Sequence, residues 1–202
     1  MFHQTWTTSV GGVGAVQYAP LAAVANGISA AAAGPNTATA NSLITGSLAV
    51  GGKVILDVAR SVLITVTHAT SIVAVSGITT GYDIDNQLIT EAWTITATGT
   101  SKTAGGAVSF KVVSGVTVTA AADATANTVT VGTNATLGLD VTSTLISPVK
   151  ELTDGVAPTA GVLVASSAAA NKDRRGLYTP NLAPNGARLF DVWYISDDPW
   201  NS

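Results

Sequence analysis

The chain has 202 residues, of which only 9 are basic and 12 acidic, so that charged residues make up 10% of the sequence and the formal net charge is −3. Ordinary soluble domains carry roughly 25% charged residues, and so sparse a basic complement argues against nucleic acid as the main partner. The chain has no Cys, which excludes disulfides and thiolate metal sites. It also has no apolar run of about 18 residues that would form a membrane-spanning helix.

Residues 1–52 contain no Lys, Arg, Asp or Glu, and the first formally charged side chain is that of Lys53. A free tail in water is usually charged and poor in apolar residues, whereas apolar residues recur throughout this segment. We therefore expect 1–52 to be an assembly arm that lies on protein, either on the chain's own body or on a neighbouring subunit. The alternative is an ordinary apolar start of a domain. The apolar anchors are Phe2, Trp6, Val10, Val13, Val16, Tyr18, Leu21, Val24 and Ile28.

Two further expectations concern the same segment. Pro20 to Ala33 is the one plausible helix, because Pro suits the first helical position, Ala is the best helix former and Gly34-Pro35 would end it; Gly27 weakens it. The first six residues lack the basic end and apolar core of a secretory signal, so a complete chain would be made and used without classical export.

Residues 53–150 are dense in strand signals, with alternating Thr and Val punctuated by Gly, Asn and Asp. Short strands separated by turns at this spacing predict an all-β core, a β-sandwich of the jelly-roll or Ig-like Greek-key type. The expected strands are 53–58, 61–67, 72–82, 87–97, 107–113, 116–121, 128–132 and 145–150.

Two hairpins are predicted within this core. Asp83-Ile-Asp-Asn86 is a good turn, because Asp and Asn tolerate left-handed backbone angles. Val116-Thr-Val-Thr and Thr128-Val-Thr-Val alternate in register and are expected to pair. In the strand that follows the first turn, Glu91 shares a face with Trp93, so we expect that end of the face to be wet.

Residues 151–202 form a loop-rich C-terminal extension. It contains a possible strand at 161–166, loop-like sequence over 171–185 and a final strand at 188–195. The pair Arg174-Arg175 is the densest basic cluster, and an Arg fork can bind a carboxylate through two parallel hydrogen bonds. We weigh a subunit-bridging role against a local loop clamp or plain solvation.

No catalytic, cofactor or metal site is predicted. The two histidines, His3 and His68, lie in different segments, and no Gly-x-Ser-x-Gly elbow is present. Asp83 and Asp85 suggest a weak cation site at most, because the calcium-loop pattern stops after Asn86; a solvated turn is the simpler interpretation. Trp93 and Trp193 sit within strands and are expected to belong to the core.

Several phrases of the sequence resemble structural proteins of tailed bacteriophages. The similar stretch runs from Asn26 to Thr133 and includes residues 51–65, 81–91, 110–113 and 129–133; residues 175–181 also look like such proteins. The resemblance implies a virion protein, most similar to a head decoration (cement) protein, assembled in the host cytoplasm. It carries over no catalytic residues.

We therefore expect a non-enzymatic capsid-stabilising protein whose partners are the major capsid protein and copies of itself, as in a homo-oligomer such as a trimer. No nucleic acid, membrane or small-molecule substrate is expected. The alternative is a tail, neck or fibre component that contacts a host glycan, and a glycan hydrolase is the third hypothesis. The interface candidates are Phe2, Trp6, Val13, Tyr18, Leu21, Arg174, Arg175 and Tyr178.

Overall fold

The computed structural model describes residues 13–33, 41–42, 44–96, 98–120, 127–139, 145–157, 159, 161–164 and 176–196, and these form an all-β protein built from antiparallel strands. The strands are β1 (Val13–Tyr18), β2 (Ser29–Ala33), β3 (Asn41–Ser42), β4 (Val54–Thr67), β5 (Val75–Tyr82), β6 (Leu88–Ile95), β7 (Ser101–Ala120), β8 (Thr128–Gly138), β9 (Leu145–Thr153), β10 (Val162–Val164), β11 (Leu177–Thr179) and β12 (Phe190–Ser196). The described residues include no helix that could cross a membrane.

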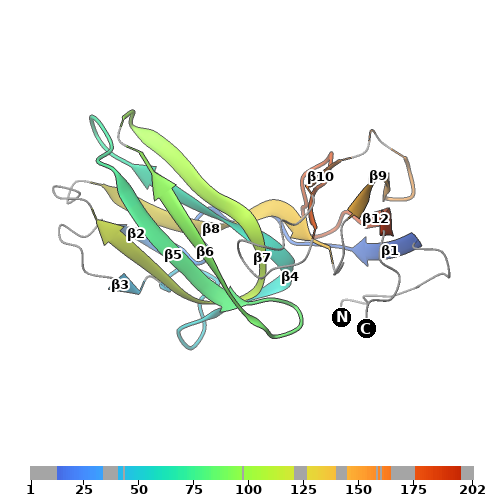
Figure 1. Ribbon diagram of the computed structural model, residues 1–202, viewed down its shortest axis with the longest axis horizontal. Helices are drawn as coiled ribbons and strands as arrows, with labels where there is room; N and C mark the ends of the chain where they lie inside the picture. Colours follow the sequence, from blue (N-terminus) through green and yellow to red (C-terminus); the bar gives the residue numbers. More distant parts are fainter. Residues whose placement is uncertain are drawn as a thin grey trace.

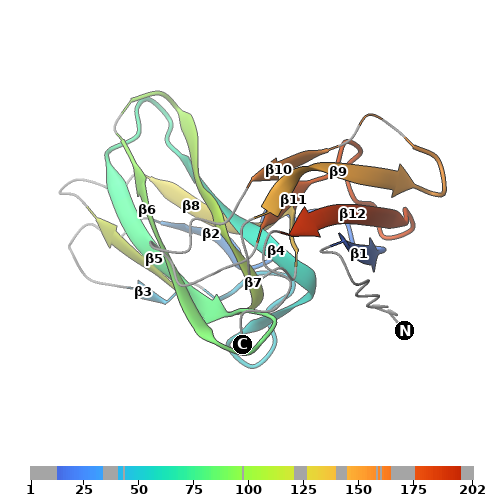
Figure 2. The ribbon, with the colours of Figure 1, turned by 45° about the vertical axis from the view of Figure 1, so that its right-hand side comes forward.

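The strands form two sheets that lie side by side (Figures 1 and 2). The large sheet has nine strands in the order β10-β11-β8-β4-β7-β5-β6, with β2 pairing with β8 and β3 with β7. The small sheet has the order β1-β12-β9. Every described pairing is antiparallel.

Strand β7 explains how one sheet encloses a core. Its first part pairs with β4 and its last part with β5, so it changes partners along its 20 residues. Gly105 and Gly106 adopt φ of 85° and 95° where the β4–β7 register shifts. A bulge with left-handed glycine bends a strand, and β7 curves round so that β5 and β6 face β4 and β8 across the interior (Figure 1).

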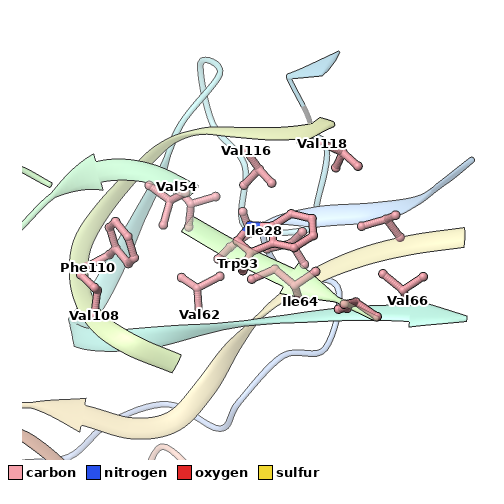
Figure 3. Close-up of a cluster of buried hydrophobic side chains, with 14 of the residues drawn as sticks. Ile28, Val54, Val62, Ile64, Val66, Trp93, Val108, Phe110, Val116 and Val118 are labelled. Atoms are coloured by element: carbon pink, nitrogen blue, oxygen red, sulfur yellow. The ribbon is translucent and has the colours of Figure 1, made fainter. Parts of the chain in front are cut away.

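The main core fills this interior with aliphatic side chains and two aromatic rings (Figure 3). Trp93 of β6 lies against Gly77, its cross-strand neighbour on β5: a Cβ placed on Gly77 would stand 2.2 Å from the Trp93 ring. Glycine thus creates the space that the indole occupies. The labelled members of the cluster are Ile28, Val54, Val62, Ile64, Val66, Trp93, Val108, Phe110, Val116 and Val118.

A second, smaller core joins the two sheets. Leu137 and Leu139 at the end of β8 pack with Tyr178 of β11 and with Phe190 and Val192 of β12. The small sheet is therefore held to the large one by apolar contact as well as by the polar contacts described below.

The turn predicted at residues 83–86 is confirmed, but the second predicted hairpin is wrong. Asn86 adopts φ of 62°, and the amides of Asn86 and Asp83 bond to the carbonyls of Asp83 and Gln87. By contrast, β7 and β8 lie on opposite sides of β4 and do not pair with each other. Alternation identifies a strand but does not choose its partner.

Three other expectations require correction. The helix at Pro20–Ala33 is wrong: 19–28 is loop and turn, and Ser29–Ala33 is β2, because pairing with β8 overrides the helical preference of Ala. Residues 53–67 contain one strand rather than two, β4, with bulges at its register shifts. Glu91 is buried, and its carboxylate accepts the Ala107 amide at 2.6 Å.

The described part of the uncharged segment 1–52 belongs to the chain's own body. β1 pairs with β12, β2 pairs with β8, and the Ile28 side chain is fully buried in the main core. The described part of the segment is therefore divided between both sheets. The division of the chain into arm, core and extension at residues 52 and 150 stays a prediction. Residues 1–12, 34–40 and 43 lie outside the described part.

Candidate interaction surfaces

Tyr178, an interface candidate, lies inside the protein. Its side chain is fully buried, and its hydroxyl donates to a carboxylate oxygen of Glu151 and accepts the Gly161 amide at 3.0 Å. Burial raises the Tyr178 pKa well above its ordinary value, and the hydrogen bond to Glu151 raises it further. The expectation of a surface contact is therefore corrected, because Tyr178 uses both its ring and its hydroxyl within its own chain.

Glu151 is the centre of this buried polar network, which sequence reasoning missed. Besides Tyr178, its carboxylate accepts from the Thr153 hydroxyl at 2.7 Å, the Gly161 amide at 3.1 Å and the Asn181 amide at 3.3 Å. These donors come from β9, from the residue before β10 and from the loop after β11. One carboxylate thus fastens the small sheet to the large one. The sequence did not predict this role, because Glu151 is a single acidic residue in a loop-rich stretch with no motif around it.

Leu21, a second interface candidate, has an exposed side chain and a clamped backbone. Its side chain is 47% exposed. Its amide donates to Asp57 Oδ2 at 2.6 Å, and its carbonyl accepts from Arg60 Nη1 at 3.1 Å. Arg60 and Asp57 also form an ion pair at 2.8 Å. The pair therefore holds the main chain of the N-terminal segment against β4, while the Leu21 side chain stays available to a partner.

Burial shifts the pKa values of the charged groups around the Asp57–Arg60 pair. Desolvation lowers the Arg60 pKa, and the Asp57 charge opposes that effect. Lys111 donates to the carbonyls of Leu56 and Asp57, both at 2.8 Å, and desolvation lowers its pKa as well. All three charged groups are committed to holding backbone, which is a structural role.

The remaining interface candidates are only partly described. Val13 and Tyr18 begin and end β1, where the structure gives their strand pairing with Ile195 and Phe190. Phe2, Trp6, Arg174 and Arg175 lie outside the described residues. Their predicted roles remain predictions.

His68 and Asp83, two candidates for catalysis or metal binding, stabilise turns through their hydrogen bonds. His68 Nδ1 accepts the amides of Thr70 and Ser71, both at 2.9 Å. Asp83 is buried, and its Oδ1 accepts the Gln87 amide at 2.9 Å. Among the described residues, no group of three or more His, Asp or Glu could hold a metal ion.

A row of apolar side chains crosses the outer face of β4, β7, β5 and β6, and the outward positions of β5 and β6 carry no charge. At β4 the row is flanked by Lys53 and Asp57, which share a face with Ile55. Ile55 of β4, Val112 of β7, Tyr82 of β5 and Leu88 of β6 stand opposite one another in register and so form one row on that face. Ile55 is 65% exposed and Leu88 58% exposed. The other outward positions on β5 and β6 are occupied by Ser, Thr, Ala and Ile78.

The outer face of the small sheet is different, because it combines an aromatic ring with polar groups. Trp93 is in the core as predicted, but that prediction is wrong for Trp193, which is 45% exposed. Phe190 and Val192 of the same strand are buried, so Trp193 shares the outward face with Asp191. Asp191 accepts from Gln17 Nε2 of β1 at 2.6 Å. The alternation of Phe190-Asp-Val-Trp193 carried this signal, since it places Trp193 on the polar side of the strand.

Comparisons with protein-family models, with curated proteins and with solved structures found no match.

Proposed function

We propose that this chain is a structural, non-catalytic component of a tailed-phage particle, and that it decorates and stabilises the head as a homo-oligomer bound to the major capsid protein. The observation that carries the proposal is the apolar row of Ile55, Val112, Tyr82 and Leu88, with exposed Ile55 and Leu88, together with the uncharged outer face of β5 and β6. Contiguous exposed apolar rows mark surfaces that other proteins cover. A face without charge can be covered without desolvating an ion.

We also infer that the curved nine-stranded sheet is a β-sandwich, with β8, β4 and the first part of β7 in one layer and the last part of β7, β5 and β6 in the other. Support comes from the change of partner along β7 and from the main core, to which β4, β6 and β8 all contribute. A compact β domain with an exposed apolar row suits a repeating lattice, since many identical weak contacts add to a firm attachment.

The alternative is a tail, neck or fibre component that touches a host glycan. It is favoured by one specific observation, the exposed Trp193 beside the Gln17–Asp191 pair. Head decoration remains the leading proposal, because the sequence resemblance is most similar to head decoration proteins and lies mainly in the large sheet, which carries the apolar row.

The test uses the full-length chain with Ile55→Lys and Leu88→Lys combined, which places two charges in the apolar row without changing the core. We expect the double variant to fold normally, to lose self-association in light scattering and to lose co-sedimentation with particles that lack the chain. Val162→Lys is the matched control, because Val162 of β10 is 64% exposed but lies at the other end of the large sheet. Binding of the double variant at wild-type level would contradict the proposal.

A further inference from the structure

The outer face of the small sheet carries a compact group of side chains with mixed chemistry. Trp193 of the central strand β12 stands opposite Lys150 of β9 in the strand register, and Asp191, two residues earlier, stands opposite Gln17 of β1. Residues that are directly opposite share a face, as do residues two apart on one strand. An indole, an ammonium group, a carboxylate and an amide therefore lie on one surface about three strands wide.

We propose that this surface is a saccharide-binding site, in which the Trp193 indole stacks against the C–H face of a neutral hexose ring and Gln17, Asp191 and Lys150 bind its hydroxyl groups. A flat aromatic ring offers a large apolar contact at low entropic cost. The polar groups beside it give orientation, in the usual division of labour of a small-molecule site. The head-decoration role does not require this site, so the inference goes beyond the leading proposal; it would equally serve the alternative role of contact with a host glycan.

The polar groups of this surface can both donate hydrogen bonds to sugar hydroxyl groups and accept hydrogen bonds from them. The Gln17–Asp191 bond uses one amide hydrogen and one carboxylate oxygen. An amide and a carboxylate together have further donor and acceptor positions, and the lysine ammonium supplies donors only. Sugar hydroxyls both donate and accept, so one ring can satisfy all three side chains.

The same groups disfavour an apolar protein partner as the occupant. Covering Trp193 with an apolar surface would also desolvate the adjacent Asp191 and the exposed Lys150, which is costly unless each finds a partner. A hydrated saccharide replaces lost water contacts with its own hydroxyls. This separates the Trp193 surface from the uncharged row of Ile55 and Leu88, where a protein partner meets no such cost.

The surface is held in position from behind. On the inward side of β9, Glu151 receives its several hydrogen bonds, and on the inward side of β12 the side chains of Phe190 and Val192 are fully buried. Asp154 fixes the start of β12 through two bonds to Leu189, both of 2.8 Å. A site whose supporting strands are fixed before binding loses less entropy on association.

The test measures saturation-transfer NMR and calorimetric titration of the full-length chain with maltohexaose, cellohexaose and chitohexaose. We expect at least one hexasaccharide to bind, Trp193→Ala to weaken that binding by at least tenfold, Gln17→Ala to weaken it several-fold, and Trp193→Phe to retain most of it. Leu88→Ala is the control on the other exposed face and should bind as wild type.

Two results would overturn the inference: none of the three hexasaccharides binds, or Trp193→Ala binds as wild type. A Trp193→Ala variant that binds saccharide normally but changes its oligomeric mass would assign the surface to protein contact instead. Particle co-sedimentation of Trp193→Ala keeps the two proposals apart, because a saccharide site predicts normal attachment to the particle.

Discussion

The buried network at Glu151 makes the sharpest stability prediction, through the substitution Tyr178→Phe. The change keeps the ring in the second core and removes one hydroxyl, which donates to Glu151 and accepts from the Gly161 amide. A hydrogen bond to a charged group contributes about 1.5–3 kcal/mol, and the Glu151 carboxylate left behind is buried. We therefore expect the free energy of unfolding to fall by about 2 kcal/mol, which lowers the Tm by about 5 °C in a chain of this size.

The assay is urea unfolding followed by circular dichroism, with Tyr82→Phe as the matched control. Tyr82 is half-buried on the outer face of β5, so its substitution should change the unfolding free energy by less than about 0.5 kcal/mol. Glu151→Gln should cost more than Tyr178→Phe, about 3 kcal/mol, because an NH₂ group would then face donors that now bond to oxygen. A Tyr178→Phe protein as stable as wild type would refute the claim that this network fastens the two sheets.

Three further predictions follow from the packing and the charges. Gly77→Ala should destabilise the fold by more than about 3 kcal/mol, since the new Cβ would stand 2.2 Å from a carbon of the Trp93 ring. Gly115→Ala should be tolerated, because the nearest atom to its new Cβ is 3.9 Å away. The urea midpoints of both variants check this. Arg60→Met should cost about 3 kcal/mol by leaving the Asp57 carboxylate without its cation, and amide exchange should show faster opening of the clamped N-terminal segment. The raised pKa of Tyr178 keeps its proton in the folded state while the unfolded chain loses it, so stability should fall as pH rises above about 10. Tyr178→Phe should therefore lose less stability than wild type in alkaline unfolding curves. The lowered pKa of Lys111 acts in the opposite direction, but equally in both proteins.

Local features of the fold were predictable from the sequence. The turn at residues 83–86 follows from the conformational freedom of Asp and Asn, and the inward positions of Ile89, Trp93 and Ile95 follow from alternation along one strand. Each depends on neighbours within a few residues.

Partner choice was not predictable in the same way. β8 follows β7 in sequence, yet β4 lies between them, because long-range burial and not proximity along the chain selects the pairing. The Ala-rich run at Ser29–Ala33 is a strand for the same reason: small side chains pack beside β8 once the large sheet exists. Local propensity is a weak guide where tertiary contacts decide.

The candidate surfaces likewise differ in how far they were predictable from the sequence. The exposure of Trp193 was present in the alternation of its strand, whereas the row of Ile55, Tyr82 and Leu88 depends on the register of four strands. The burial of Tyr178 depends on Glu151, which lies 27 residues away in sequence. Only the assembled sheets bring these groups together.

Cryo-electron microscopy of purified particles that carry this chain tests the central claim most directly. The proposal predicts density for the two-sheet protein at regular positions on the outer surface of the head, with the row of Ile55 and Leu88 against a neighbouring subunit. Absence of the chain from purified particles would contradict a virion role, and density confined to the tail or fibres would contradict head decoration.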